Sequence, residues 1–320
     1  MKKIIVLGGT GFVGTHLCEK LVREGWQVTV PTRRTINAKA VMHLPGLTVQ
    51  QLDVHDEAAL TRAVDGHDAL VNLVAILHGT QAAFEHVHVA LPQKIAHACL
   101  INGVGQVVHI SALGADSLQP ALAPSMYLRT KGEGEAVLVQ AAMGGSAGDT
   151  AQAGFDLSIL RPSVMFGAED KFLNLFARLQ KVLPLMPLAG AAARFQPVWV
   201  QDVAMAVVRC LAGASTQPSP RVIEAFGPEV LTLKQLVQIA AQLSGAGGGM
   251  GRLVIPLPAW AGRLQATIMG MAPGAPLMSL DNLESMKVDN VATGKHPGLD
   301  SLGITASAVR PIARQYLGRR

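Results

Sequence analysis

The stretch IIVLGGTGFVGTHLCEKL, residues 4–21, decides the fold of this chain. A run of four apolar residues leads directly into Gly8, Gly11 and Gly14, and a pattern typical of an amphipathic helix follows. Glycines at this spacing allow a tight turn, let a pyrophosphate approach backbone N–H groups, and let the helix pack closely on the strand. The N-terminus of the helix then faces the phosphates. The residues that we expect to contact a dinucleotide here are Gly8, Thr10, Gly11, Phe12, Val13 and Gly14.

Short apolar runs alternate with longer helical patterns through the first half of the chain. Strands this apolar are buried on both faces, which is typical of a parallel sheet covered by helices on each side. We therefore expect an α/β fold with a doubly wound parallel (Rossmann-like) sheet and a smaller C-terminal lobe. The expected strands are 4–7, 28–30, 49–52, 69–74, 107–110 and 157–160, and the expected helices are 12–24, 56–65, 84–102 and 127–142.

The pattern changes after Pro162, where the final part of the chain becomes rich in proline and glycine. We expect residues 1–163 to form the dinucleotide-binding domain, and residues 164–320 to form mostly a smaller lobe for a substrate or partner. Residues 195–227 are expected to return to the first domain, because VIEAFG at 222–227 has the pattern of a buried strand. Helical patterns at 170–183 and 232–244 belong to the lobe, and the Gly/Ala/Ser-rich stretch 143–154 predicts a flexible surface loop.

Composition narrows the class of protein. Of the 320 residues, 49% are hydrophobic and 15% are charged, which indicates a well-packed globular protein. The net charge is +5, but the lysines and arginines are scattered and aromatic residues make up only 4%, so nucleic-acid binding is not expected. The mild basicity fits an anionic small ligand or an ordinary solvated surface. Three dispersed cysteines predict buried reduced thiols, and ten dispersed histidines predict no metal site.

The first residues, MKKIIVL, resemble a signal peptide in their two lysines, but the apolar run ends at Gly8 after four residues. No stretch approaches 18 uninterrupted apolar residues, so no membrane-spanning helix is expected. We expect a cytoplasmic protein, with peripheral attachment to the inner membrane as the alternative.

The second expected strand ends VTVPTRRT, and this ending bears on the choice of dinucleotide. A carboxylate there would bind the ribose 2′-hydroxyl of NAD, whereas Arg33 and Arg34 suit a 2′-phosphate. We therefore expect NADP, with NAD as the alternative cofactor. The two arginines could also simply face solvent and contact no cofactor. After the third strand, Asp53 and its neighbour Val54 are placed to contact the adenine, although Asp53 could equally be a turn or helix-capping residue.

A group of residues suited to proton transfer follows the fifth strand. Ser111 comes at its carboxyl end, where open α/β sheets bind ligands, and Tyr127 and Lys131 are spaced i, i+4 on one helical face. A nearby ammonium and an oxidised nicotinamide would lower the phenol pKa from about 10. Tyr127 could then exchange a proton with a substrate hydroxyl or carbonyl, Ser111 could bind the same oxygen, and Lys131 could reach the nicotinamide ribose. The alternative is that the pair only anchors the cofactor.

These motifs occur in the order seen in one large family. The glycine loop, Asp53, Asn72–Ala75, Ser111, the Tyr127/Lys131 pair, LRPSVMFG (160–167) and PVWVQDVA (197–204) resemble the extended short-chain dehydrogenases/reductases over nearly the whole chain. RPSVMFGAEDKFLNLFA (161–177), PAWAGRLQATIMG (258–270) and DNLESMKVDN (281–290) are similar to its atypical branch, which contains the NADPH-binding accessory subunit of respiratory complex I.

The resemblance implies a fold and a set of contacts. It implies cofactor contacts from Val74 and Ala75, contacts to the nicotinamide amide from Pro162 and the backbone up to Val164, and a positioning role for Asp202. Active members usually carry an Asn that organises a proton-relay water where this chain has His88. We expect an oxidoreductase or epimerase acting at a hydroxyl or carbonyl carbon of an unknown small molecule. The alternative is a non-catalytic NADPH-holding accessory protein associated with respiratory complex I or quinone metabolism.

Two features of the C-terminal part concern partners. Trp260, Leu264 and Ile268 form one helical stripe, with Met269 and Met271 nearby. We expect this stripe to dock onto the protein's own core, with a respiratory-complex or membrane-surface partner as the alternative. Arg194 could bind an anionic group of the substrate, or it could be exposed to solvent. A basic tail could assist at anionic lipid or simply be solvated, and it consists of Arg310, Arg314, Arg319 and Arg320.

Overall fold

The computed structural model describes residues 2–144, 154–213, 218–271 and 278–318, with side chains up to residue 268 in the third range. A seven-stranded sheet runs through the centre of the first part in the order β11-β6-β5-β4-β1-β2-β3, and every neighbouring pair is parallel. The order reverses between β1 and β4, and ligands of doubly wound sheets bind outside the carboxyl ends of the strands at such a switch point. The predicted fold class is therefore confirmed.

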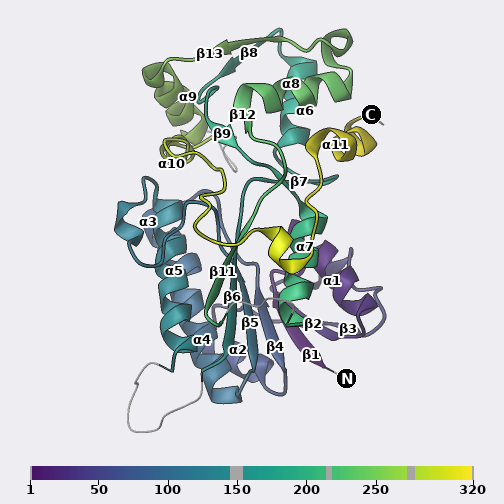
Figure 1. The fold of residues 1–320 in the computed structure, drawn as a ribbon, viewed down its shortest axis with the longest axis vertical. Helices are drawn as coiled ribbons and strands as arrows, with labels where there is room; N and C mark the ends of the chain where they lie inside the picture. Colours follow the sequence, from purple (N-terminus) through teal and green to yellow (C-terminus); the bar gives the residue numbers. More distant parts are fainter. Residues whose placement is uncertain (1, 145–153, 214–217, 272–277, 319–320) are drawn as a thin grey trace.

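The strands and covering helices lie close to the predicted ranges. One face of the sheet carries α1 and α7, and the other carries α2, α4 and α5 (Figure 1). The strands are β1 (Lys3–Leu7), β2 (Gln27–Thr32), β3 (Leu47–Gln51), β4 (Ala69–Asn72), β5 (Gln106–Ile110), β6 (Asp156–Pro162) and β11 (Arg221–Ala225). The helices are α1 (Phe12–Arg23), α2 (Glu57–Val64), α4 (Leu91–Asn102), α5 (Met126–Ala142) and α7 (Val200–Leu211).

Two predicted elements differ in length or form. The strand expected at 69–74 ends at Asn72, because the side-chain Oδ1 of Asn72 accepts a hydrogen bond from the N–H of Val74 at 3.1 Å and turns the chain. The helix expected at 84–102 is three pieces: α3 (Gln81–Glu85), a π-helical turn η2 (His86–Ala90) and α4. Short π-helical insertions of this kind occur frequently at functional sites.

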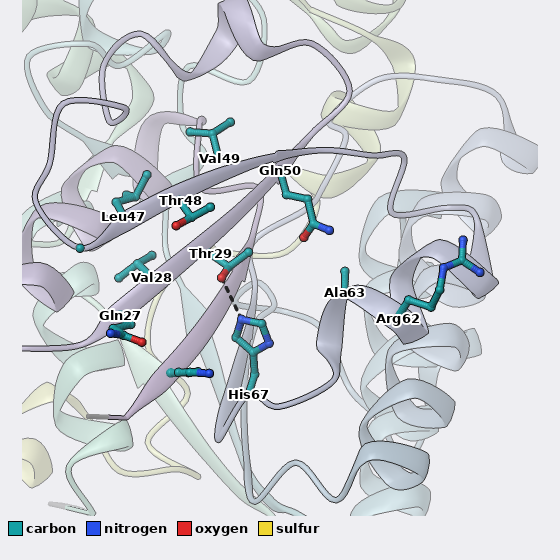
Figure 2. Close-up of a pocket in the computed structure, with 12 residues that line it drawn as sticks. Gln27, Val28, Thr29, Leu47, Thr48, Val49, Gln50, Arg62, Ala63 and His67 are labelled. Carbon is teal, nitrogen blue, oxygen red and sulfur yellow. Dashed lines mark hydrogen bonds between the residues drawn. The ribbon is translucent and has the colours of Figure 1, made fainter.

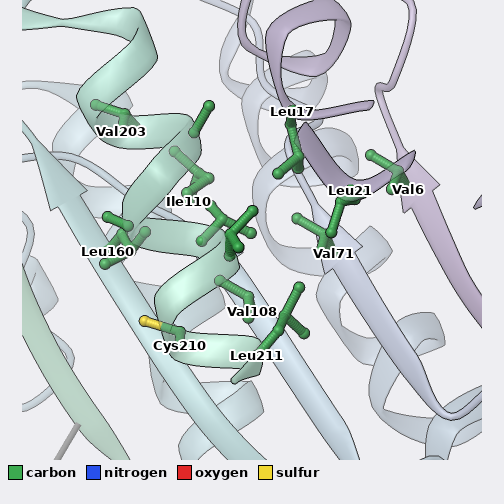
Figure 3. Packing of buried hydrophobic residues seen from close by; sticks show 14 of the residues in the cluster. Val6, Leu17, Leu21, Val71, Val108, Ile110, Leu160, Val203, Cys210 and Leu211 are labelled. Atoms are coloured by element: carbon green, nitrogen blue, oxygen red, sulfur yellow. The ribbon is translucent and has the colours of Figure 1, made fainter. Parts of the chain in front are cut away.

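Apolar cores fill both faces of the sheet. Figure 3 shows the first, in which Leu17 and Leu21 of α1 and Val203 of α7 meet the side chains of the central strands. The opposite core joins α2, α4 and α5 to the same strands, with Leu60, Ile95 and Leu138 fully buried. All three cysteines lie buried in or beside these cores as free thiols, as predicted, and burial raises the pKa of each.

The C-terminal lobe has a core of its own at the end of the molecule away from the N-terminus (Figure 1). It is built from α6 (Leu173–Val182), β8 (Leu185–Leu188), α8 (Leu233–Ser244), β13 (Leu253–Pro256) and α11 (Val309–Leu317), with α9 (Ala259–Met271) and α10 (Leu280–Ser285) beside it. The remaining short elements are η1 (Thr35–Ala38), η3 (Pro120–Leu122), β7 (Met165–Phe166), β9 (Arg194–Phe195), β10 (Val198–Trp199), β12 (Leu231–Thr232), η4 (Ala246–Gly249) and η5 (Leu299–Leu302).

The apolar stripe of α9 does not dock onto the core, and that prediction is wrong. Trp260, Leu264 and Ile268 are 71%, 55% and 60% exposed. The opposite side of the helix, Gly262 and Ala266, faces the lobe instead. Small residues allow a close approach, so the helix packs through them and its large side chains point to solvent.

Several sequence expectations fall outside the described residues. They are most of the 143–154 loop, the side chains of Met269 and Met271, and Arg319 and Arg320 of the basic tail. No helix in the described ranges is both long enough and apolar enough to cross a bilayer.

Candidate functional site

The glycine loop between β1 and α1 is shaped by contacts that exclude side chains. Gly8 has φ +82°, and a Cβ on Gly14 would lie 2.4 Å from the carbonyl oxygen of Gly8. A Cβ on Gly9 would lie 2.9 Å from the side chain of Val30 in β2. The sequence analysis missed Gly9, because its constraint comes from a strand about twenty residues away. The backbone therefore folds into a tight cradle beside the start of β2.

The cradle opens onto the N-terminus of α1. The cap residue of this helix is Gly11, which offers no side-chain hydrogen bond, and the first turn contains no acidic residue. The N–H groups of a helix start need partners and favour an anion, so the arrangement suits a pyrophosphate. The ring of Phe12 lies against the chain after β7, because a Cβ on Gly167 would meet it at 3.2 Å. Phe12, Thr10 and Val13 are half-buried along this cradle.

The expected adenosine end lies after β2 and β3. Arg33 and Arg34 are exposed, and neither forms an ion pair with a carboxylate among the described residues. The Asp53 carboxylate accepts a hydrogen bond from the backbone N–H of His55 at 3.0 Å, which is the turn role that the sequence left open. Val54 is half-buried against the core of α2 and α4.

The same region gathers two histidines and a lysine that the sequence analysis did not single out. The rings of His55 and His86 stack with centroids 4.2 Å apart, and the Nζ of Lys94 donates to the carbonyl of His55 at 2.5 Å. Burial lowers the pKa of His55, and the neighbouring His86, Lys94 and Arg33 lower it further. The cations at the end of the site where a 2′-phosphate is expected are therefore Arg33, Arg34 and Lys94, whereas the lowered pKa of His55 keeps its imidazole neutral.

Lys131 joins α5 to the end of β5. Its Nζ donates to the carbonyl of Ile110 at 2.6 Å, and the side chain is 1% exposed. Ser111, the next residue along the chain, is buried, and its Oγ has no hydrogen-bond partner among the described residues. Two of the three predicted catalytic side chains are therefore neighbours at the carboxyl edge of the sheet, and Tyr127 is one helical turn before Lys131.

Burial governs the pKa values of the Tyr127/Lys131 pair in the protein without a cofactor. Burial lowers the pKa of Lys131 to about 8, although Glu135 acts in the other direction. Burial, followed by the charge of Asp281, raises the pKa of Tyr127 to about 12. Without a cofactor, desolvation and a nearby carboxylate thus raise the phenol pKa, and the lowering expected beside an oxidised nicotinamide stays a prediction.

Asp281 belongs to a segment, residues 279–290, that returns from the lobe to the candidate site. Its Oδ1 and Oδ2 accept hydrogen bonds from the backbone N–H groups of Met126 and Tyr127, at 2.7 and 3.1 Å. The Ser285 hydroxyl donates to Ser125 Oγ, the cap of α5, at 2.8 Å. A carboxylate at a helix N-terminus is stabilising, so this segment fixes the start of the helix that carries Tyr127. The sequence analysis quoted the segment only for its resemblance and missed this role.

The predicted contacts at the nicotinamide end are partly occupied by protein. Pro162 is buried at the end of β6, and its carbonyl accepts from Leu113 N–H at 3.0 Å. The N–H of Val164 donates to Asn290 Oδ1 at 2.9 Å, and its carbonyl accepts from Val198 N–H at 3.0 Å. A contact from Val164 to a nicotinamide is thereby left to its side chain.

His88, the departure from the family pattern, is buried and fully hydrogen-bonded. Its Nε2 accepts from the N–H of Ile76 at 3.2 Å, and its Nδ1 lies 3.0 Å from Thr130 Oγ1. The backbone donor fixes the tautomer, so Nδ1 carries the proton and donates to Thr130, which donates in turn to Met126 O at 2.9 Å. Burial and Lys131 lower the pKa of His88 to about 3. Neither ring nitrogen is left to bind a relay water.

A second buried histidine lies at the end of β5. The Nδ2 of Asn72 donates to His109 Nδ1 at 3.1 Å, which leaves Nε2 as the N–H donor. That Nε2 is buried with no partner among the described residues. The other side-chain atom of Asn72 holds the turn that leads to half-buried Val74 and exposed Ala75. The predicted contact loop after β4 is thus anchored to the same strand end as Ser111.

The floor of the site is a buried ion pair that the sequence analysis did not identify. Glu135 on α5 accepts from Arg161 on β6 through both carboxylate oxygens, at 3.0 and 2.6 Å. The carboxylate is completely buried and the guanidinium nearly so. Bidentate geometry and complete burial tie α5 to the sheet one turn beyond Lys131.

The other sequence candidates lie away from this arrangement. Arg194 is exposed on β9 and pairs with Asp289 at 3.4 Å. Asp202, in the first turn of α7, accepts from the N–H of Ser307 at 2.8 Å. No cluster of three metal-ligating side chains occurs within the described ranges. Figure 2 shows a hollow of about 780 Å³ over β2 and β3, where His67 bonds Thr29, but it lies at the opposite ends of the strands from Ser111.

The residues present fit a nicotinamide dinucleotide. The cradle of Gly8–Gly14 excludes any Cβ, the start of α1 lacks a side-chain cap, and Ser111 Oγ and His109 Nε2 are buried polar atoms without partners. Six other buried side-chain atoms in the described ranges also lack partners, so it is the combination of these two with the glycine cradle that fits a ligand. When bound, such a cofactor supplies a carbon that gives or accepts hydride.

Comparison with known proteins agrees with this geometry. Residues 4–225 match the NAD dependent epimerase/dehydratase family. The chain belongs to this family. It is 31% identical over 329 residues to the mitochondrial NADH dehydrogenase [ubiquinone] 1 alpha subcomplex subunit 9 of Rattus norvegicus, covering 98% of this chain and 79% of that protein. It is 24% identical to the mitochondrial NADH-ubiquinone oxidoreductase 40 kDa subunit of Neurospora crassa, covering 98% and 78%.

Solved structures of epimerases and dehydratases share the fold. The dTDP-glucose 4,6-dehydratase of Streptomyces venezuelae, solved with NAD, has a TM-score of 0.66 at 23% identity and covers 80% of this chain and 84% of that one. The UDP-glucose 4-epimerase of Thermus thermophilus, also with NAD, has a TM-score of 0.62 at 19% identity, covering 89% and 99%. The predicted family resemblance is confirmed, and so is its branch, because relatives of the complex I subunit match over nearly the whole chain.

Proposed function

We propose that this protein holds NADPH as a structural cofactor and serves as an accessory subunit of, or assembly partner for, membrane-bound respiratory machinery. Ser111, Tyr127 and Lys131 would anchor the nicotinamide end of the cofactor without turning it over. The rat and Neurospora relatives are named as parts of an NADH dehydrogenase, which supports the assembly role.

One observation carries the proposal: the carboxylate of Asp281 is hydrogen-bonded to the N–H of Tyr127 itself. A negative charge at this position, added to burial, holds the phenol in its neutral form. A neutral phenol can donate a hydrogen bond to a ribose or a nicotinamide, but it is a poor base near neutral pH. The closed hydrogen-bond chain through His88 acts in the same direction, because it offers no nitrogen to a proton relay.

The preference for NADPH over NADH rests on the cationic end of the site. Arg33 and Arg34 follow β2 where an NAD-specific protein would carry a carboxylate, and Lys94, which donates to the carbonyl of His55, lies beyond them. A 2′-phosphate would give the guanidinium groups a charged partner that they otherwise lack.

A second function, oxidoreductase or epimerase chemistry at a hydroxyl or carbonyl carbon, is favoured by Ser111. Its hydroxyl is buried and without a partner, as expected of a group reserved for a substrate oxygen.

Comparison of the parent with Tyr127→Phe separates the two functions. The measurements are NADPH consumption across a panel of carbonyl compounds and sugar nucleotides, and thermal melting with and without NADPH. For a holding role we expect no consumption by either protein, and stabilisation by NADPH in both. Turnover by the parent that falls by about 10²–10⁴ in Tyr127→Phe would establish the catalytic role instead.

A further inference from the structure

The far end of the C-terminal lobe exposes large apolar side chains. We call it the distal face and define it by Val182, Leu185, Met250, Leu253, Ile255, Trp260, Leu264 and Ile268, all of which are exposed. Leu185 and Leu253 are register partners on β8 and β13, and the buried Met186 and Val254 alternate with them toward the lobe core. The outer surface of this small sheet is therefore apolar where a solvated strand would carry polar residues.

Helix α9 extends the distal face. An ordinary surface helix buries its large apolar side chains, but α9 exposes them. Its buried positions are Gly262 and Ala266, and a Cβ on Gly262 would come within 2.8 Å of Ala189. Its solvent side carries Trp260, Leu264 and Ile268. Such a helix leaves its large apolar side chains exposed to water, and an exposed apolar surface of this kind typically marks a site of contact with a partner or a membrane.

The charged residues in the two stretches of sequence that carry the distal face are all positive. Residues 171–201 and 230–280 contain seven lysines and arginines and no Asp or Glu, while the rest of the chain has twenty lysines and arginines against twenty-two acids. The net positive charge of the protein therefore originates in these two stretches. Cations alternate with exposed apolar residues along them, as in Lys181–Val182, Arg252–Leu253 and Arg263–Leu264. Glu284 pairs with Arg263 at the rim, at 3.4 Å.

We propose that the distal face docks on the surface of an anionic lipid bilayer, with α9 lying in the interface. Apolar side chains interleaved with cations suit a surface whose interior is hydrocarbon and whose headgroups are negative. The indole of Trp260 has the mixed apolar and polar character that places this residue at the headgroup level of membranes. Arg178 lies one turn before Val182 on α6, so a cation and an apolar residue share that exposed side as well.

A second copy of this chain fits the distal face less well. A two-fold dimer through this face would oppose identical surfaces, so its cations would meet cations, while the rim carboxylate of Glu284 already pairs with Arg263 and Lys287 of its own chain. Charge complementarity therefore favours the bilayer over self-association.

Flotation of the full chain with extruded vesicles tests the proposal. We expect it to float with phosphatidylcholine vesicles that contain roughly a third phosphatidylglycerol, and to float far less with phosphatidylcholine alone. Replacing two interface side chains in the double variant Leu264→Gln/Ile268→Gln should weaken binding at least about tenfold. The double variant Arg178→Gln/Arg252→Gln should remove most of the preference for anionic vesicles, since each cation near such a surface contributes about fivefold.

Two controls separate docking from damage to the fold. Leu118→Gln removes an apolar side chain that is 89% exposed but lies on the sheet domain, and it should bind vesicles like the parent. Leu264→Gln/Ile268→Gln should keep the melting temperature of the parent, because both side chains are exposed. Arg252→Gln also removes the hydrogen bond that Arg252 Nε donates to the carbonyl of Gln180 at 3.3 Å, so vesicle binding by that variant is measured well below its own melting temperature. Trp26 is buried and Trp199 half-buried, so a blue shift of fluorescence on anionic vesicles should disappear in Trp260→Phe.

Three outcomes would overturn the proposal. The first is no flotation with anionic vesicles at low salt. The second is equal flotation of the parent and Leu264→Gln/Ile268→Gln. The third is a concentration-dependent dimer of the parent in sedimentation equilibrium that this double variant abolishes, which would assign the distal face to a second copy. None of these measurements depends on cofactor binding, so each is independent of the NADPH-holding role.

Discussion

Asp281→Asn should lower the pKa of Tyr127, and the composition of the chain makes this measurable. The sequence contains only two tyrosines, so Tyr316→Phe leaves Tyr127 as the single phenol. The Tyr316 hydroxyl bonds Asp170 on the lobe, far along the chain from Tyr127, so the background variant leaves the candidate site intact. Near-ultraviolet absorbance after a rapid pH jump then reports the ionisation of Tyr127 alone.

The magnitude follows from the two causes of the shift. The pKa of about 12 lies about two units above the ordinary value, and two units correspond to about 2.7 kcal/mol. Burial is the larger cause and Asp281 the smaller, so removing the charge should restore less than half of the shift. We therefore expect Asp281→Asn to titrate between about 11 and about 12. Because the folded pKa is the higher one, the stability that Tyr127 contributes is present below about pH 10 and is lost as the pH rises toward about 12.

Asp289→Asn is the matched control, since it removes a carboxylate of the same 279–290 segment that pairs with Arg194 and does not contact α5. It should leave the phenol titration unchanged. A parent phenol that ionises at or below about 10, or an equal shift in both variants, would refute the idea that Asp281 keeps Tyr127 neutral.

Two further predictions concern the helix crossing and the cofactor. In Gly134→Ala the new Cβ would lie 1.9 Å from the carbonyl oxygen of His88, so unfolding in urea should show a loss of about 3 kcal/mol or more, whereas Gly105→Ala, whose nearest atom is at 3.7 Å, should change little. Calorimetry should show tighter binding of NADPH than NADH by the parent, and Arg33→Ala or Arg34→Ala should cost about 1.5–3 kcal/mol of NADPH affinity alone. Equal affinities for the two cofactors in the parent would remove the case for NADP.

The central sheet could be predicted from the sequence because its determinants are local. Each strand is a short apolar run bounded by a turn, and Gly8, Gly11 and Gly14 follow the first strand at a spacing that few other structures require. The position of Ser111 at a strand end, and of Tyr127 and Lys131 on one helical face, also follows from periodicity alone. These features need only neighbours along the chain.

The electrostatics of the site could not be predicted in this way. The raised pKa of Tyr127 depends on burial and on Asp281, which is separated from it by 154 residues. The role of His88 depends on Ile76 in the loop after β4 and on Thr130 in α5, which crosses η2 at Gly134. A tyrosine–lysine spacing indicates that two side chains share a face, but the sign of each pKa shift depends on burial and on charges from distant segments.

The apolar stripe on α9 shows a second limit of prediction from sequence. The spacing of Trp260, Leu264 and Ile268 correctly predicts an apolar helix face, but periodicity does not determine what covers that face. The information lies in the residues between them: Gly262 and Ala266 allow the helix to approach Ala189 closely, so the lobe takes the small side. A helix with one large apolar side and one small-residue side can pack through either.

The energetics of the candidate site favour a cofactor that stays bound. Ser111 Oγ and His109 Nε2 are buried and unpaired, and each such atom costs about 1–3 kcal/mol until a partner is supplied. Lys131 is buried with its pKa lowered to about 8, so its ammonium also gains from a ligand with oxygen acceptors. A dinucleotide at a hundred times its dissociation constant adds about 2.7 kcal/mol of stability by binding only the folded state. Hydrogen bonds from the dinucleotide to these two atoms would lower its dissociation constant, and through it raise the stability that a given cofactor concentration adds.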